Sequence, residues 1–501
     1  MADRSTIDRD SSDPAVAVTE LSSRPFWTFL LLHVVLWTLL PALFHPNAPL
    51  DVVEEISWGR EWQWGYYKHP PLAPWLANAA YLASGGKLWS IFLLSQLCIA
   101  LCFWTVWKLA RELVGETRAL AAVVLLEGII YYNFTSPEFN PNVLQLPLWA
   151  LVVYCGWKAI NSGGTVQWVL LGVFSGSALL TKYYSAALLL CMALAILLHS
   201  KQATWKPPLS AAIAFCIFLP HLLWMRENDF ITLTYAVDRA SAKKTLLTHL
   251  LYPIDFTASQ LLAVALMLIA FLAIYGRPRL SFSPYSDVAA RFLSIVVLGP
   301  FVLTFVLSLL MNWKLRSMWG TPLWTFLPLL VLILFPPSHR GSEYRRIRNK
   351  GMVLTGVMSL AFLIPLTIGP YIHAKPRKAL FVGCGMSEQI TQSWKAATGN
   401  PLKIVAGDTW LAGNVAFYST DRPATFTEAN QLFSPWITPE QLRRDGAVIV
   451  WQGSAELPQI YRAAFPDAVI QHPLTVPWHT RKQVEPVTVH WAISHPAGKN
   501  N

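Results

Sequence analysis

The apolar stretch Pro25-Phe-Trp-Thr-Phe-Leu-Leu-Leu-His-Val-Val-Leu-Trp-Thr-Leu-Leu-Pro-Ala-Leu-Phe44 decides the fold class of this 501-residue chain. Its length matches the roughly 20 residues with which a helix crosses the hydrocarbon core of a bilayer. The preceding residues, 1–24, are polar and of mixed charge, without the basic start and cleavage site of a removable signal peptide. We therefore expect a first transmembrane helix after a cytoplasmic N-terminal tail.

Further apolar runs repeat this pattern near 88–107, 119–133, 143–158, 166–181, 183–199, 209–225, 253–275, 291–311, 318–335 and 352–371. The composition agrees, because 54% of the residues are hydrophobic and 13% are charged, about half the charge of an average soluble domain. The sequence predicts an α-helical polytopic membrane protein with about eleven transmembrane helices in residues 25–372.

Basic residues alternate along the predicted loops and give an orientation. If the N-terminus is cytoplasmic, every inner loop is basic; these loops contain Lys108, Arg111, Arg118, Lys158, Lys201, Lys206, Arg277, Arg279, Arg291, Arg340, Arg345, Arg346, Arg348 and Lys350. The loop near 133–142 has no Lys or Arg, as expected outside. The net charge of +11 is then attributed to topology and not to nucleic-acid binding, with a solvated basic surface as the alternative.

The segment 373–501 differs in composition and is expected to be a soluble α/β domain on the outer side. Short β-rich runs at 402–406, 447–451, 468–470 and 487–493 alternate with polar or amphipathic stretches. Gly407-Asp408-Thr409 follows the first of these runs and is interpreted as a strand-to-helix cap or a binding turn. The whole chain lacks the glycine-rich nucleotide-binding loops and shows no metal-ligand spacing. No cofactor and no divalent metal are expected.

The first outer loop, residues 45–87, contains the most informative charges. If its first part is helical, Asp51 lies on one face with Glu54, Glu55 and Trp58. One interpretation is a helix on the bilayer surface with a solvated acidic side. The other is a reaction site, because carboxylates near the membrane are costly unless they are solvated or paired.

The end of the same loop favours the reaction site. Lys68 and His69 precede Pro70-Pro71-Leu72, which form a rigid turn and cannot continue a helix inward. A cation beside carboxylates suits a reaction in which a phosphate leaves and a nucleophile needs a base.

These motifs resemble the GT-C type integral-membrane glycosyltransferases. The likeness is greatest to protein O-mannosyltransferases, the lipid A aminoarabinose transferase and the rhizobial galacturonosyltransferases of lipopolysaccharide. It extends over roughly residues 25–240, and its motifs are Asp51, Lys68-His69-Pro70-Pro71-Leu72, Ser136-Pro137-Glu138-Phe139-Asn140 and Thr181-Lys182-Tyr183-Tyr184. The pattern departs from many members, which have adjacent Asp-Glu where this chain has Asp51-Val-Val-Glu54-Glu55.

The resemblance implies roles for individual residues. Asp51 matches the first-loop acid that acts as base or positions the acceptor, and the spacing leaves Glu54 as the alternative base. Lys68 and His69 match the basic position that contacts the carrier phosphate, and Glu138 matches the second-loop acid that orients substrates. From their positions at outer helix ends, Lys182, Tyr183 and Arg226 are added as candidate carrier-phosphate or acceptor contacts; a surface or headgroup location is the alternative for each.

The expected activity is transfer of one sugar, with inversion, from a polyprenyl-phosphate carrier to an envelope acceptor at the outer face of a bacterial inner membrane. The acceptor is lipid A or its core, another glycolipid or a protein. The alternative function is a transporter or flippase of a lipid-linked saccharide, which typically shows inverted repeats and broken helices.

Overall fold

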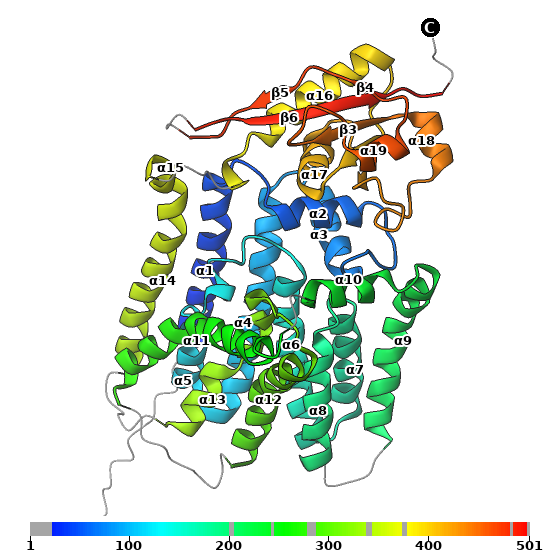
Figure 1. Ribbon diagram of the computed structural model, residues 1–501. Coiled ribbons are helices and arrows are strands. Elements are labelled where there is room, and N and C mark those ends of the chain that lie inside the picture. Colours follow the sequence, from blue (N-terminus) through cyan, green and yellow to red (C-terminus); the bar gives the residue numbers. More distant parts are fainter. Residues whose placement is uncertain are drawn as a thin grey trace, which may run out of the picture.

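A computed structural model describes residues 23–199, 205–241, 245–277, 287–336, 343–372, 378–480 and 484–497. Nearly all of the predicted N-terminal tail lies outside the described residues, as do Lys201, Arg279 and Arg340 of the predicted basic loops. The described residues form a bundle of helices with a smaller α/β domain, built from the end of the chain, stacked on one end of the bundle (Figure 1).

The bundle contains long helices that alternate with shorter ones. Its elements are α1 (Arg24–Phe44), α4 (Trp89–Val114), α5 (Glu116–Leu126), η1 (Ile130–Tyr132), α6 (Pro141–Ser162), α7 (Thr165–Leu179), α8 (Ser185–His199), α9 (Lys206–Glu227), α11 (Thr248–Tyr275), α12 (Asp287–Met311), η2 (Ser317–Trp324), α13 (Leu327–Leu334), α14 (Glu343–Thr367) and α15 (Gly369–Ile372). Each apolar run of the sequence contains helix, which confirms the polytopic α-helical class.

Fewer of these helices are full spans than the sequence predicts. Among the described residues seven helices are long and apolar enough to cross a bilayer, and η2 with α13 forms an eighth candidate bent by 53°. The helices α7 and α8 have only 15 residues each, and α5 has 11. The run near 119–133 is shortened because the chain leaves the helix at Glu127, whose carboxylate is buried and bonded to His33.

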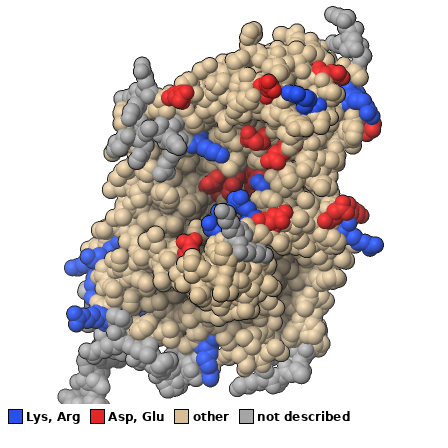
Figure 2. Space-filling view, in the orientation of Figure 1, with Lys and Arg blue, Asp and Glu red and all other residues tan. Residues whose placement is uncertain are grey.

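The outer surface of the bundle is apolar, as a lipid-facing surface must be. Large aliphatic side chains are exposed on the long helices, for example Leu31 on α1 and Leu262 on α11, which is 79% exposed. Isolated apolar residues are common on soluble proteins, but a surface this extensive indicates contact with lipid. On the face drawn in Figure 2, the middle of the bundle carries few charged side chains.

The C-terminal domain is built around a mixed sheet. It comprises η3 (Lys378–Leu380), α16 (Gly383–Thr398), β1 (Ile404–Gly407), α17 (Thr409–Tyr418), β2 (Ala424–Thr427), α18 (Pro439–Asp445), β3 (Ala447–Trp451), α19 (Gln459–Ala464), β4 (Val469–Ile470), β5 (Leu474–Val476) and β6 (Val487–Ser494). The strand order is β2-β1-β3-β6-β4, with β5 paired to β6. β1 is parallel to β2 and β3, whereas β6 runs antiparallel to β3, β4 and β5. The four predicted strands are present, which confirms a small α/β domain.

Short helices lie between the bundle and this domain and position the site. They are α2 (Leu50–Gly59) and α3 (Leu72–Ala83) of the first outer loop, and α10 (Ile231–Ala240) (Figure 1). The loop is tied to the C-terminal domain by hydrogen bonds: the Ala48 amide donates to the Tyr418 hydroxyl at 2.7 Å, and the Asn47 amide donates to the Ala379 carbonyl at 3.1 Å. Gly413 packs α17 against Val53 of α2, where a Cβ at the glycine would come within 3.2 Å of the valine side chain.

Candidate active site

A cavity of about 750 Å³ lies where the bundle, the first outer loop and the C-terminal domain meet. Figure 2 shows a hollow below the C-terminal domain in which acidic and basic side chains gather. The cavity walls come from α2, the start of α6, the α7–α8 turn, α10, η2 and the turn between β1 and α17. Six residues singled out from the sequence line it: Asp51, Glu54, Lys68, His69, Lys182 and Tyr183.

The acidic face of α2 is largely buried, which contradicts the alternative interpretation of a bilayer-surface helix with a solvated acidic side. Glu54 and Glu55 are 7% and 1% exposed, because α17 and the 60–71 segment cover the helix. Burial raises the pKa of Glu55 well above its ordinary value, and the neighbouring charges of Glu54 and Asp51 raise it further. Burial and the two neighbouring carboxylates thus favour the neutral form of Glu55.

Glu54 is paired with the lysine that precedes the proline turn. Lys68 Nζ lies 2.5 Å from Glu54 Oε1, and the ammonium group also lies 5.2 Å from the ring centre of Tyr67. Burial acts to lower the pKa of Lys68, but attraction to Glu54, Tyr67 and Tyr235 together outweighs it, and the pKa is raised. Burial also raises the pKa of Glu54, against the charge of Lys68, and Glu54 is already engaged by this cation.

Asp51 is held differently, by the second outer loop. Asn140 Nδ2 donates to Asp51 Oδ2 at 2.9 Å, and the Asp51 amide donates to Glu138 Oε1 at 3.2 Å. Asn140 is also the N-cap of α6, where its Oδ1 accepts the Asn142 and Val143 amides. One asparagine thus fixes both the start of a helix and the orientation of the Asp51 carboxylate, which remains only partly buried and lines the cavity.

Asp51 and Glu138 form a carboxyl pair in a desolvated place. Burial raises the pKa of Asp51, against the Asn140 hydrogen bond and the charges of Lys68, Lys182 and Lys378. Burial and then the charge of Asp51 raise the pKa of Glu138 to about 7. Glu138 is not among the residues that line the cavity, and its contact is with the Asp51 backbone amide. The charge of Asp51 links the titration of Glu138 to that of Asp51.

Lys182 is a buried cation that also lines the cavity. Its ammonium group donates to Asn142 Oδ1, and the side chain is 9% exposed. Burial lowers the pKa of Lys182 to about 8, although the charge of Asp51 opposes this. The adjacent Tyr183 donates to Thr232 Oγ1 at 2.8 Å and lies 2.6 Å from His221 Nε2, so it joins the α7–α8 turn to α9 and α10.

His69 differs from its expected role in charge, and Arg226 differs from its expected role in position. His69 lines the cavity, but burial followed by the charges of Lys182 and Lys68 lowers its pKa well below the ordinary value. It is a neutral hydrogen-bonding group and not a cation. Arg226 is exposed near the end of α9 and does not line the cavity; Arg239 of α10 does.

The C-terminal domain supplies part of the cavity wall, and the sequence indicated only some of the residues in this part. Asp408 caps α17 through the Trp410 and Leu411 amides at 2.7 and 2.9 Å, as a strand-to-helix cap should, and it also lines the cavity. Glu428 lines the cavity too, with its backbone in the left-handed region at φ 52°. The cap was visible in the sequence, but no local pattern marked Glu428.

Within the described ranges, no group of three or more His, Cys, Asp or Glu side chains is arranged to hold a metal ion. Three carboxylates of the cavity, those of Glu54, Asp51 and Asp408, are engaged with Lys68, Asn140 and the α17 amides, respectively. The charged groups that face the cavity can take up and release protons and can pair with an anion.

Comparison with known proteins shows which proteins this chain resembles in sequence and in fold. Residues 68–224 match the family described as dolichyl-phosphate-mannose-protein mannosyltransferase. The crystal structure of ArnT from Cupriavidus metallidurans bound to undecaprenyl phosphate superposes with a TM-score of 0.64 at 15% identity, covering 94% of this chain and 98% of that chain. The chain has the GT-C-like fold, and its resemblance to GT-C type integral-membrane glycosyltransferases is confirmed.

Two curated relatives extend over most of the chain. The lipopolysaccharide core galacturonosyltransferase RgtB of Rhizobium johnstonii is 25% identical over 461 residues, which cover 84% of this chain and 90% of the relative. The lipopolysaccharide core galacturonosyltransferase RgtA of the same organism is 21% identical over 448 residues, covering 85% of each. An undecaprenyl phosphate-α-4-amino-4-deoxy-L-arabinose arabinosyl transferase of Pseudomonas aeruginosa is 25% identical over 42% of each chain.

Proposed function

We propose that this protein is a glycosyltransferase that transfers one sugar from a polyprenyl-phosphate carrier to an envelope acceptor, in a single displacement that inverts the anomeric carbon. Asp51 is the base. The observation that carries the proposal is the position of this carboxylate, in a cavity of about 750 Å³ that is also lined by the half-buried Lys68 and the buried Lys182.

Asp51 is a better base than Glu54 because its carboxylate is not bound to a cation at hydrogen-bonding distance. Glu54 Oε1 lies 2.5 Å from Lys68 Nζ, whereas Asp51 Oδ2 accepts from the neutral amide of Asn140 at 2.9 Å. In the reaction, an acceptor hydroxyl forms the new bond to the anomeric carbon and loses its proton to Asp51. The bond from that carbon to the carrier phosphate breaks, and the phosphate leaves with the electron pair.

The wall around Lys182 suits the departing phosphate. Lys182 provides a buried ammonium group, and the N-terminal turn of α6 lines the cavity at Pro141 and Asn142. The Asn142 and Val143 amides are already bonded to Asn140, so this helix start favours an anion through its dipole alone. A preorganised cation in a water-poor site stabilises developing negative charge far more than it would in water.

The remaining wall suits a lipid carrier. Leu233 and Val237 of α10, with Trp313, Met318 and Trp319 near η2, form an apolar side of the cavity. Relatives support a lipid-linked donor: the Pseudomonas aeruginosa transferase is named for an undecaprenyl-phosphate sugar, and the similar ArnT structure contains undecaprenyl phosphate. The galacturonosyltransferase relatives act on lipopolysaccharide core, so we propose lipid A or its core as the first acceptor to test.

A reaction on the outer side of the membrane is also part of the proposal. We propose that the N-terminus is cytoplasmic in a bacterial inner membrane and that the C-terminal domain is periplasmic. This follows from the basic loops, among them Lys108, Lys158 and Arg345.

The test is mass spectrometry of envelope glycolipids from a deletion strain complemented with the native chain, Asp51→Asn or Asp238→Asn. Asparagine keeps the size of Asp51 and removes its proton affinity. Asp238 is an exposed carboxylate on α10 that does not line the cavity, so it is the matched control. We expect one sugar mass to disappear on deletion, to return with the native chain and Asp238→Asn, and to stay absent with Asp51→Asn at equal protein level.

Two outcomes would contradict the proposal. Full restoration by Asp51→Asn means that Asp51 is not the base, and Glu54→Gln would then be examined. A deletion that leaves every glycolipid mass unchanged excludes a glycolipid acceptor, and the protein-acceptor and transport functions would then be compared by labelled-sugar incorporation.

A further inference from the structure

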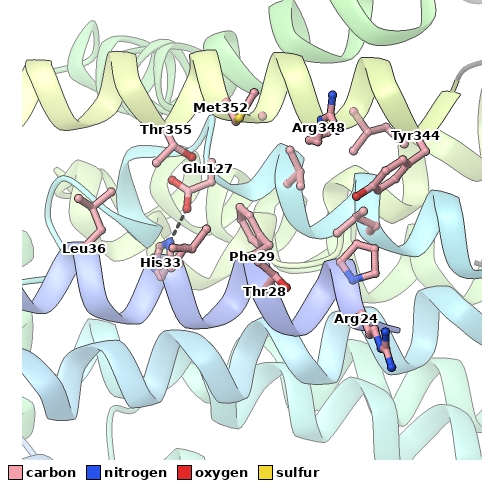
Figure 3. Close-up of a pocket in the computed structure, with 16 residues that line it drawn as sticks. Arg24, Thr28, Phe29, His33, Leu36, Glu127, Tyr344, Arg348, Met352 and Thr355 are labelled. Atoms are coloured by element: carbon pink, nitrogen blue, oxygen red, sulfur yellow. Dashed lines mark hydrogen bonds and ion pairs between the residues drawn. The ribbon is translucent and has the colours of Figure 1, made fainter. Parts of the chain in front are cut away.

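A second pocket, unrelated to the cavity, opens between α1 and α14 at the end of the bundle away from the C-terminal domain. It has a volume of about 640 Å³ and a mostly apolar wall. Figure 3 shows α1 and α14 side by side with residues of both facing the pocket and with α5 behind. The helices touch farther along, where Trp37 packs edge-on against Phe362 at 5.5 Å between ring centres. The pocket is therefore a groove closed at one end.

The open end of the groove is lined by basic side chains and by side chains that carry a hydroxyl group. Arg24 and Thr28 lie on the first turns of α1, and Tyr344 and Arg348 lie on the first turns of α14. Both arginines are exposed, and each comes from a different wall of the groove (Figure 3). Guanidinium groups at the ends of membrane helices reach the headgroup region and pair with phosphate.

The length of the groove matches one leaflet. The lining residues of α1 run from Arg24 to Leu36, which is about 18 Å at 1.5 Å per residue. Half of a bilayer core of about 30 Å is about 15 Å. The groove is therefore long enough for an extended acyl chain from the headgroup level to the bilayer midplane and too short for a chain that crosses both leaflets.

The inner end of the groove contains a buried polar pair. His33 Nδ1 bonds to Glu127 Oε1, and Asn133 Nδ2 donates to Glu127 Oε2 at 3.1 Å. Both side chains of the pair are 0% exposed, yet His33 Nε2 has no hydrogen-bond partner in the described part of the chain. A buried polar atom without a partner costs free energy, and an acyl chain cannot supply that partner. The length of the groove and the arginines at its open end are therefore the features that indicate an occupant.

We propose that this groove is a binding site for one anionic phospholipid. An acyl chain lies between α1 and α14, and the phosphate is held between Arg24 and Arg348. The inference rests on the fold and does not depend on the transferase activity, because the groove and the cavity share no lining residue.

The test uses native mass spectrometry of the full chain in detergent, titrated with phosphatidylglycerol or with phosphatidylcholine of the same acyl chains. We expect phosphatidylglycerol to bind more tightly. The double substitution Arg24→Gln/Arg348→Gln should weaken phosphatidylglycerol binding about 25-fold, since each basic residue near an anionic lipid contributes a factor of about five. Phosphatidylcholine binding should be nearly unchanged.

Two further variants separate a groove site from general surface charge. Arg345→Gln removes an exposed arginine of the same helix that does not line the groove, and it should leave phosphatidylglycerol binding unchanged. Thr28→Trp fills the open end of the groove and should weaken the binding of both lipids. Melting temperatures measured without added lipid should match the native value, which excludes misfolding.

Equal binding of the two lipids to the native chain would overturn the proposal, and so would full retention of phosphatidylglycerol binding by the double variant. If Arg345→Gln lost as much phosphatidylglycerol binding as the double variant, surface charge and not the groove would attract the lipid. Because glycolipid transfer is measured separately, failure here leaves the proposed transferase function intact.

Discussion

Replacing Lys182 by methionine removes a buried cation from the cavity while keeping an unbranched side chain of similar length. The lysine is 9% exposed, and its ammonium group donates to the neutral side chain of Asn142. No carboxylate lies at ion-pair distance from it among the described residues, so its charge is available to a bound phosphate. Loss of one such preorganised group lowers kcat by about 10²–10³-fold, and we expect a loss of this size in sugar transfer.

The pH dependence gives the same residue a second signature. Burial lowers the pKa of Lys182 to about 8, and the protonated form is the one that pairs with phosphate. Transfer should therefore fall above pH 8, by about tenfold per pH unit. In Lys182→Arg the guanidinium stays protonated, so part of the activity should remain and the alkaline decrease should disappear.

The assay uses purified protein, a lipid extract of the native strain as donor and the glycolipid of the deletion strain as acceptor, with the product measured by mass spectrometry. Lys87→Met is the matched control, because Lys87 is exposed and does not line the cavity. The reasoning is refuted if Lys182→Met retains the native rate and the native pH profile. It is also refuted if Lys182→Arg keeps the alkaline decrease near pH 8.

Three further tests use other residues. Glu138→Gln keeps the oxygen that accepts the Asp51 amide and removes the group whose pKa lies at about 7, so a change of transfer rate near pH 7 that comes from Glu138 should disappear; an identical profile near pH 7 in the native chain and the variant would contradict a part for Glu138 in the pH dependence. Lys68→Met leaves Glu54 buried without its cation and should destabilise the protein by about 3 kcal/mol in unfolding measurements, and adding Glu54→Gln should recover much of that loss. Asp408→Ala and Thr438→Ala each remove a helix cap worth about 1 kcal/mol, but only Asp408 lines the cavity, so glycolipid analysis should show reduced transfer for that variant alone.

The sequence predicted the helical class wherever an apolar run is long and uninterrupted, as in α4 and α11. It overestimated the number of full spans where a polar residue interrupts the run. Near 119–133, the helix ends at Leu126 and Glu127 is buried by bonding to His33, 94 residues earlier. An average of hydropathy over a window contains no information about a partner so distant in the chain.

The site could be predicted to the extent that its residues lie at helix ends on one side of the membrane. Asp51, Lys68 and Lys182 line one cavity, in keeping with their predicted positions at outer helix ends. The interpretation of α2 as a helix with a solvated acidic face was wrong because α17, which lies more than 350 residues later in the chain, covers that helix. Periodicity indicates which residues share a face, but not which element packs against it. Glu428 could not be predicted for the same reason.

The division of the cavity between two parts of the chain has a consequence for how such proteins diverge. The groups proposed to react, Asp51 and Lys182, belong to the membrane part, whereas Asp408 and Glu428 belong to short connections after β1 and β2 of the soluble part. Mutations in those connections can reshape the recognition of a partner molecule while the reacting groups stay constrained by their buried neighbours. Duplicated genes can thus acquire new specificities through the soluble part, and chimeras that exchange this part between relatives would inherit selectivity from one parent and chemistry from the other.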